Sequence, residues 1–397
     1  MTKDYSPFTP GVPVPVEFFV GRQAEVNRLC EKVGAAATGR LQVAFVSGER
    51  GIGKSSVASF VKVLVERDFK VLGLHTFLGG VTSLEEMARR IFDRLLKESV
   101  ERTWFDKVKE FFGNHIRQVG LFGVSVELGV SDKDLRRAVH DFAPALRRLT
   151  HELRNERKGI LLILDDINGL ASSLDFANWL KSLVDEIATS GKPLPLCLLL
   201  VGLEERRQSL ISLNPSLARI FDLVEIQAWK DEETQAFYRN AFGKVDVTLE
   251  EEALAALCRF SGGLPVLAHE IGDAAFKTDK DNLIDSDDAY WGVRGAAEIV
   301  GRKYLEPQVF KAIRSTRYRT ILRKLVEQGH EFQRADVRRQ LSKEENRVFD
   351  NFLRRMSDLG VIVRDSERGP GSYRFRNLLY AFYFRLEAER AQESRES

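Results

Sequence analysis

The strongest constraint in this sequence is the segment Gly-Glu-Arg-Gly-Ile-Gly-Lys-Ser, which begins at Gly48 and satisfies the pattern GxxxxGK[ST]. An apolar run typical of a buried strand (residues 41–46) precedes it, and a helical pattern begins at Lys54. Glycines let the backbone curl so that its N–H groups face a phosphate at the start of a helix. The alternative is a chance glycine turn, but strand, motif and helix agree. The segment predicts a phosphate-binding loop in an α/β protein.

The residue types of this loop suggest individual roles. The Lys54 ammonium supplies positive charge to the β- and γ-phosphates, and the Ser55 hydroxyl is a ligand for Mg²⁺. We therefore expect ATP and Mg²⁺ as cofactors. The other predicted nucleotide contacts in this loop are Gly48, Glu49, Arg50, Gly51, Ile52, Gly53 and Ser56.

A phosphate-binding loop of this type needs an acidic residue at the end of a neighbouring buried strand. The segment Ile-Leu-Leu-Ile-Leu-Asp-Asp (160–166) provides two. We expect Asp165 to hold the magnesium ion through water, and Asp166 to orient or activate the attacking water. A solvated turn with adjacent carboxylates is the alternative, but the fully apolar strand before them argues against it.

The order of the apolar segments defines the fold class. Strand patterns at 70–77, 159–164 and 196–201 alternate with helical patterns, and the chain is 44% hydrophobic. Strands that are apolar on both faces are typical of the centre of a parallel sheet. We predict an α/β fold: a P-loop parallel sheet with helices on both faces, then a small helical lid and a winged-helix domain.

The sequence also indicates the cellular compartment and the domain boundaries. No run of 18 apolar residues or signal-like N-terminus occurs, and the three cysteines form no CxxC pair, so we expect a cytoplasmic protein without transmembrane segments. The predicted domains are an extended arm (1–17), a P-loop ATPase domain (18–230) with an insert (about 101–131), a helical lid (231–295), a winged-helix domain (296–386) and a tail (387–397).

The total charge of +2 is unevenly distributed, because the C-terminal part of the chain is strongly basic. Residues 301–380 contain 19 Lys or Arg against 10 Asp or Glu. Helical patterns at about 308–327, 334–341 and 343–359 precede a hairpin pattern at 361–364 and 372–376, which is the order of a winged helix. Such modules place their third helix in the major groove of DNA and touch phosphates with the wing. The candidate DNA contacts are Arg347, Arg354, Arg355, Arg368 and Arg374.

The insert is the least regular part of the first domain. Apolar residues from Trp104 to Val119 recur at helical spacing, and residues 124–130 alternate as in a half-exposed strand. The aromatic stripe, which includes Phe105, Phe111 and Phe112, is typical of a core or subunit interface. A partner-binding or membrane-touching element is the alternative.

Taken together, these motifs resemble those of AAA+-type ATPases. The resemblance rests on Phe-Val-Gly-Arg (19–22) with Glu25, the P-loop, the strand ending in Asp165 and Asp166, Leu-Leu-Val-Gly (199–202) and Ser-Leu-Ala-Arg-Ile-Phe (216–221). It is greatest to origin-recognition initiators, transposition-helper ATPases and STAND ATPases, and it extends from about residue 18 to 386.

The resemblance implies further roles. It places Val20, Gly21 and Arg22 at the adenine, Arg219 as an arginine finger toward a neighbouring subunit, and Pro265 in a Gly-x-Pro turn that contacts the base. For Arg219 a surface or ion-paired arginine is the alternative, and for Pro265 a helix-breaking turn.

The chain also departs from the family pattern. The strand-end position of the usual polar sensor reads Val-Gly-Leu (201–203), and Pro265 stands where the lid arginine is expected. His269 and Arg259 are the nearby polar residues, and we expect a structural role for each. These departures predict hydrolysis that is slow or completed by a partner.

We therefore expect an ATP-hydrolysing switch that controls assembly, as a homo-oligomer or with a protein partner, and binding of double-stranded DNA through the winged helix. The alternatives are a STAND-like signalling or defence ATPase, in which the winged helix binds protein or inhibits the site, and a scaffold that holds ATP without turnover. Salt-dependent DNA affinity separates the first two.

Overall fold

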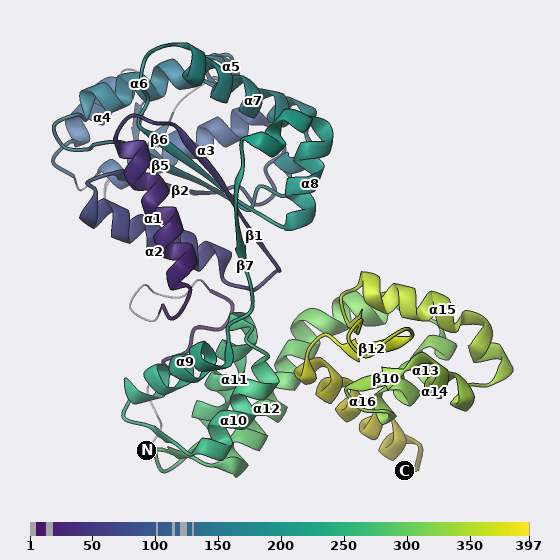
Figure 1. Cartoon of the computed structure of the whole chain (residues 1–397). Helices are drawn as coiled ribbons and strands as arrows, with labels where there is room; N and C mark the ends of the chain where they lie inside the picture. The colour runs from purple at the N-terminus through teal and green to yellow at the C-terminus, as the bar shows by residue number, and fades with distance from the viewer. Residues whose placement is uncertain are drawn as a thin grey trace. The chain divides into compact units, whose positions relative to one another are not determined.

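The computed structural model describes residues 5–12, 19–100, 102–112, 116–119, 125–128 and 131–396. The chain divides into two compact units. One unit spans Pro13–Gln227, and the other combines Met1–Val12 with Ala228–Ser397. Figure 1 shows the elements of each unit. Among the helices of the described residues, none is long and apolar enough to cross a bilayer.

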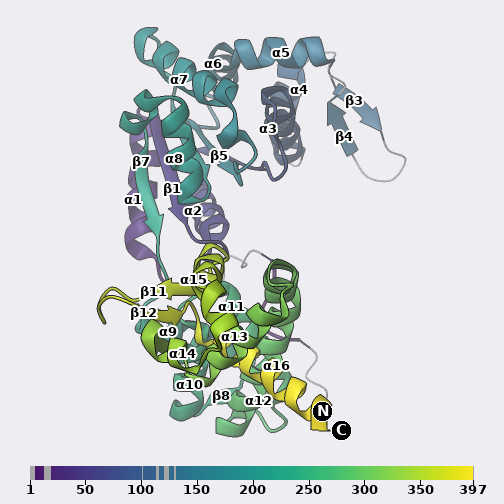
Figure 2. The ribbon, with the colours of Figure 1, turned by 90° about the vertical axis from the view of Figure 1, so that its right-hand side faces the viewer.

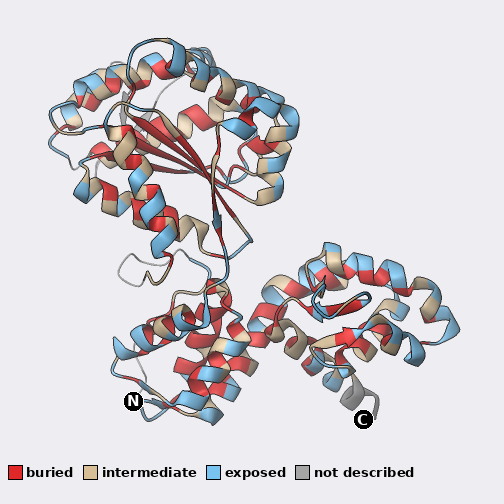
Figure 3. Cartoon of the chain, viewed as in Figure 1, coloured by how far each residue is buried: buried red, intermediate tan, exposed pale blue. Residues whose placement is uncertain are grey.

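The first unit is built on a five-stranded parallel sheet in the order β2-β5-β6-β1-β7. Four of these strands are buried along nearly their whole length, as the continuous apolar runs predict, and they appear red in Figure 3. The fifth strand, β7, lies at an edge and was not predicted. The bounds are β1 Gln42–Gly48, β2 Leu72–Phe77, β5 Ile160–Asp165, β6 Leu196–Val201 and β7 Asp222–Ile226.

Helices cover both faces of this sheet, as predicted (Figure 1). One face carries α1 (Gln23–Ala37) and α2 (Lys54–Asp68), and the other carries α3 (Leu84–Ser99), α7 (Leu174–Thr189) and α8 (Glu204–Leu213). Short 3₁₀ turns at Leu170–Ser172 and Pro215–Arg219 complete the connections.

The insert packs into the core of this unit. Helix α4 (Phe105–Phe112) buries Val108 and Phe112, and Trp104 just before it is also buried, so these side chains belong to the main hydrophobic core. The helical pattern fails further on, because Ile116–Val119 forms a strand, β3, that pairs antiparallel with β4 (Ser125–Leu128). The hairpin lies beside α3 (Figure 2). The next two helices are α5 (Asp132–His140) and α6 (Phe142–Glu152).

The second unit begins with a helical region. It contains α9 (Asp231–Gly243), α10 (Glu251–Ser261), α11 (Pro265–Thr278) and α12 (Ser286–Val300), with a short parallel pair of β8 (Thr248–Leu249) and β9 (Leu283–Ile284). Gly262, with φ +57°, ends α10 in the left-handed region, where glycine avoids the steric cost of a Cβ.

The described part of the N-terminal arm belongs to this helical region. Phe8 is 4% exposed and makes ring contacts with Phe237, Tyr238, Phe242 and His269. The backbone N–H of Thr9 donates to Nδ1 of His269 at 3.1 Å. Residues 5–12 therefore add to the hydrophobic core of the second unit.

The same unit ends in a winged helix. A π-helical segment, Gly301–Phe310, leads to α13 (Thr316–Glu327), α14 (Arg334–Gln340) and α15 (Lys343–Asp358). Strands β10 (Glu331–Gln333), β11 (Ile362–Arg364) and β12 (Ser372–Phe375) form an antiparallel sheet in the order β10-β12-β11. The predicted fold class is confirmed, with three differences in this module. Residues 308–327 are not one helix, β10 adds an unpredicted strand to the hairpin, and α16 (Leu378–Glu396) continues through the expected tail.

Candidate functional site

The predicted phosphate loop joins the carboxyl end of β1 to α2. Gly51 (φ +78°) and Gly53 (φ +93°) adopt left-handed conformations, and a Cβ on Gly48 would lie 2.6 Å from the carbonyl oxygen of Ile226. The glycines are therefore required by conformation at two positions and by close backbone approach at the third. The first turn of α2 follows directly after Gly53.

Lys54 stands at the start of α2 with its ammonium directed back to the loop. Its Nζ donates to the carbonyl oxygens of Gly48 at 2.9 Å and Glu49 at 2.7 Å. Burial lowers the pKa of Lys54, and four carboxylates act in the opposite direction: Asp165, Asp166, Glu205 and Glu49. The site therefore combines one half-buried cation, Lys54, with several carboxylates. Carboxylate oxygens are the ligands that Mg²⁺ prefers. The sequence did not identify Glu205 as part of this site. Glu205 lies in α8, which follows β6, and it comes close to Lys54 only because β6 pairs with β1 in the sheet.

Two carboxylates lie at the end of β5 in different environments. The Asp165 side chain is 4% exposed, and its Oδ2 lies 2.8 Å from Nε2 of His75. Asp166 is exposed and has φ +56°, a conformation that costs a non-glycine residue free energy. Its carboxylate accepts a hydrogen bond from the Asn168 amide, and a Cβ on Gly79 would lie 2.9 Å from Asp166 Oδ2. Backbone geometry thus directs the two adjacent acids differently.

The segment predicted at the adenine is held against the loop by its own side chains. Arg22 is buried, and its guanidinium donates to the backbone carbonyls of Gln227 and Ile52, the latter at 3.2 Å. Phe19 stacks on Phe60 of α2 with ring centroids 4.2 Å apart. Val20 and Gly21 lie between these two anchors. The structure therefore brings residues 19–22 to the phosphate loop and uses the Arg22 side chain to fix that loop.

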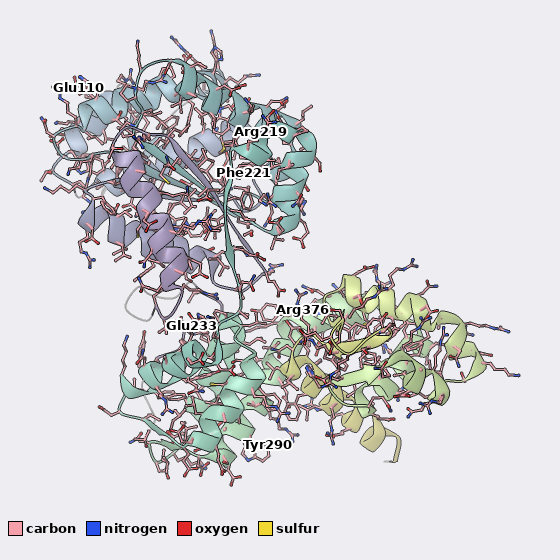
Figure 4. The ribbon with its side chains drawn as sticks, viewed as in Figure 1. Glu110, Arg219, Phe221, Glu233, Tyr290 and Arg376 are labelled. Atoms are coloured by element: carbon pink, nitrogen blue, oxygen red, sulfur yellow. The ribbon has the colours of Figure 1, made fainter. Side chains whose placement is uncertain are left out.

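Arg219 lies at the opposite end of the sheet from the phosphate loop of its own chain. It ends the 3₁₀ turn before β7, and Asp222, the first residue of β7, pairs with Ala44, four residues before Gly48. Four strand residues span about 13 Å. Figure 4 labels Arg219 and Phe221 near the start of β7. In the described part of the chain, no ion pair of Arg219 is recorded, and its side chain is exposed.

The sensor position has no polar side chain, as the sequence indicates. Gly202 follows β6, and its N–H donates to the carbonyl of Val46 at 3.1 Å. Glu204, the first residue of α8, is ion-paired with Arg207, which holds the pKa of that carboxyl below its usual range.

Pro265 and His269 belong to the second unit. Pro265 opens α11, and the preceding Gly263 has no room for a Cβ, which would lie 2.3 Å from the carbonyl oxygen of Trp229. His269 is buried among aromatic rings, and burial lowers its pKa to about 4. The ring is therefore neutral at pH 7 and supplies no cation for a phosphate. The role of Pro265 at the base stays a prediction.

The candidate DNA contacts lie on α15 and the wing. Arg347, Arg354 and Arg355 are exposed on α15, the third helix of the module. Arg354 donates to the Asn351 side chain at 2.8 Å. Arg368 in the wing is ion-paired with Glu331, and Arg374 on β12 is exposed.

Comparison with known proteins identifies the first unit. Residues 19–201 match the family model of the AAA ATPase domain. This segment is an AAA ATPase domain. ATP hydrolysis is the activity of its class, and nucleotide binding follows from it. No curated protein matched the chain in a sequence search.

Among the solved structures that share this fold, two cover nearly the whole chain. A Walker-type ATPase of Pyrococcus abyssi has a TM-score of 0.60 and 16% identity, and the match covers 97% of this chain and 100% of that one. The ORC2 protein of Aeropyrum pernix, in ADPNP–ADP complexes, has a TM-score of 0.59 and 14% identity, covering 100% and 98%. At these identities the likeness is one of fold.

Proposed function

We propose that this protein is a nucleotide-controlled switch in which the AAA ATPase domain governs assembly of the chain and binding of duplex DNA by the winged helix. The observation that carries the proposal is the presence on one chain of a formed phosphate loop and a winged helix whose third helix exposes three arginines. The Aeropyrum pernix ORC2 structure, with the same fold, contains ADPNP and ADP, which supports adenine nucleotide as the ligand here.

In this proposal each residue of the phosphate site has a separate task. Lys54 exchanges its bonds to the Gly48 and Glu49 carbonyls for the β- and γ-phosphate oxygens, and the backbone N–H groups of the loop bind the same phosphates. Ser55 and Asp165 hold the magnesium ion, which neutralises phosphate charge when bound. Asp166 accepts hydrogen bonds from the attacking water. Gly202 offers no side chain to the γ-phosphate, so hydrolysis is slow until a partner completes the site.

A second candidate follows from the charges around α15. Asp350 lies on its exposed side and pairs with both Arg334 (2.7 Å) and Arg338 (2.8 Å) of α14. Arg368, a predicted DNA contact, pairs with Glu331. The surface formed by α14, α15 and the wing therefore carries both positive and negative charges. This mixture favours a protein partner over the phosphate backbone of DNA. The second candidate is a signalling ATPase whose winged helix binds protein.

One experiment tests both candidates: steady-state ATP hydrolysis and nucleotide binding at low salt, with and without duplex DNA. We expect DNA to stimulate hydrolysis and the DNA affinity to fall steeply with salt, because phosphate contacts release counterions. A rate indifferent to DNA, without salt-dependent binding, would favour the signalling candidate.

Two variants test the assignment of the site residues in the same experiment. Lys54→Ala removes the ammonium assigned to the β- and γ-phosphates, and we expect it to abolish nucleotide binding. Asp166→Asn keeps a side chain of the same size, and we expect it to bind nucleotide but to lower turnover about 10²-fold or more, the usual scale for loss of a catalytic base. Full hydrolysis by both variants would refute the assignment of the site.

A further inference from the structure

Asp165 has a hydrogen-bond partner that the phosphate-loop motif does not contain. Successive residues of a strand face opposite sides of the sheet, and β2 and β5 are paired so that Phe77 lies opposite Asp165 and His75 opposite Ile163. His75 and Asp165 therefore project from the same face, the one covered by α2. Their Nε2 and Oδ2 atoms are 2.8 Å apart, and each side chain is 4% exposed.

The other nitrogen of the His75 ring is also engaged. Nδ1 lies 3.1 Å from the hydroxyl oxygen of Ser59, five residues after Lys54 in the same helix, α2. In the tautomer that carries its proton on Nε2, the ring donates to Oδ2 of Asp165. In the neutral ring Nδ1 then accepts from the Ser59 hydroxyl. Phe77 stacks on the ring with centroids 4.5 Å apart, which fixes its plane.

We propose that His75 is a positioning residue for the metal site: it holds Oδ2 of Asp165 and leaves the other carboxylate oxygen for the water shell of the magnesium ion. The chain Ser59–His75–Asp165 joins the helix of the phosphate loop to the strand that ends in the acidic pair. Groups that hydrogen-bond a metal-ligating side chain orient it, and their loss typically costs 10- to 100-fold in metal affinity. The inference rests on the proposed function, because Asp165 has this task only if the loop binds magnesium nucleotide.

The test separates metal binding from nucleotide binding in the full-length chain. A fluorescent derivative of ADPNP is titrated in EDTA, and Mg²⁺ is then titrated at saturating nucleotide. His75→Phe keeps an aromatic ring against Phe77 but removes the donor, and His75→Gln restores an N–H group near the position of Nε2. We expect His75→Phe to weaken apparent Mg²⁺ affinity about tenfold and to change affinity in EDTA less than about twofold. His75→Gln recovers most of the loss.

A second variant keeps the inference testable if His75→Phe unfolds. Ser59→Ala removes one half-buried hydroxyl, and we expect a smaller loss of Mg²⁺ affinity, about threefold, in the same direction, since it acts only through the ring. Unchanged Mg²⁺ affinity in Ser59→Ala and in any folded His75 variant would overturn the inference. Equal losses with and without Mg²⁺ would also overturn it, because they indicate a packing role. Absence of magnesium-dependent nucleotide binding in the wild-type chain would instead refute the proposed function.

Discussion

At the scale of single residues, His269 is buried in the helical region of the second unit, where it has a structural role. Its ring nitrogen Nδ1 accepts the Thr9 N–H, and Phe8 and Phe237 contact the ring. Burial lowers its pKa to about 4 against the opposing effect of Asp273. The second nitrogen, Nε2, is buried and has no hydrogen-bond partner among the described residues. The folded state thus binds a proton there less readily than the unfolded chain.

This lowered pKa predicts an acid-sensitive second unit. The unfolded chain takes up a proton near pH 6.5 and the folded chain only near pH 4, so stability is full above pH 6.5 and falls as the pH decreases through this interval. The total loss is about 3 kcal/mol. His269→Asn keeps an acceptor for the Thr9 N–H but cannot titrate. We therefore expect its free energy of unfolding, measured with urea, to change less between pH 7 and pH 4 than that of the wild type. The exposed His140→Asn serves as control. Parallel profiles for wild type and His269→Asn would contradict the prediction.

Residues of the candidate site could be predicted from the sequence where a short segment alone determines which residue type is needed. Gly51, Gly53 and Lys54 are such cases, because the loop geometry and the phosphate charge act within eight residues. His75 was not predictable in the same way. Its contact with Asp165 requires β2 to lie beside β5, and the two residues are 90 positions apart.

At the scale of elements, the N-terminal arm shows how a short segment is anchored by one side chain. Phe8 fills a space among the rings of α9 and α11, and a Cβ on Gly272 would lie 2.3 Å from the Phe8 ring. We expect Phe8→Ala to lower the free energy of unfolding of the second unit by about 3 kcal/mol, the usual cost of truncating a buried phenylalanine. The loss is measured by urea unfolding.

The control for this prediction lies three residues away. Tyr5 is 72% exposed, and Tyr5→Ala should change stability by less than about 0.5 kcal/mol, as for other surface substitutions. Limited proteolysis should cleave the arm faster in Phe8→Ala than in Tyr5→Ala. Equal stability of the two variants would show that the arm contributes nothing to the core of the helical region.

Elements were predictable from sequence where burial is continuous and less so where it alternates or depends on pairing. The strands β1, β2, β5 and β6 are buried on both faces along nearly their whole length. By contrast, β7 has only two buried residues, Val224 and Ile226, because it lies at the sheet edge and carries Asp222 toward Arg28 and Lys32 of α1. The strand β3 was read as a helix because its apolar residues continue the spacing of α4, and only pairing with β4 reveals it.

At the scale of the whole molecule, the proposed function requires a phosphate site that is completed by a second chain. Gly202 supplies no polar side chain at the sensor position. The one arginine that the family resemblance assigns to the γ-phosphate, Arg219, stands about 13 Å or more along the sheet from its own loop. A five-residue strand separates the two ends of the sheet, and no rotamer of arginine spans it. The arginine therefore acts in the proposed switch only on the nucleotide of a second copy.

This arrangement predicts that hydrolysis depends on assembly. We expect the specific activity of the wild-type chain to rise with protein concentration, and Arg219→Ala to lower the assembled rate by about 10³-fold, the lower end for an arginine finger, without changing the rate at high dilution. Mixing provides the sharpest measurement. Lys54→Ala binds no nucleotide but presents Arg219, whereas Arg219→Ala binds nucleotide but lacks the arginine. Neither variant should hydrolyse ATP alone, and their mixture should recover part of the wild-type rate.

The matched control is Arg137→Ala, which removes an exposed arginine of α5, 83% exposed at its side chain, and should leave the rate unchanged at every concentration. Two results would contradict an arginine that acts between copies. One is an equal loss in Arg219→Ala at all dilutions, which would place the effect within the chain. The other is a mixture as inactive as its components, since two copies with complementary defects form at least one complete site whenever the finger acts across the interface.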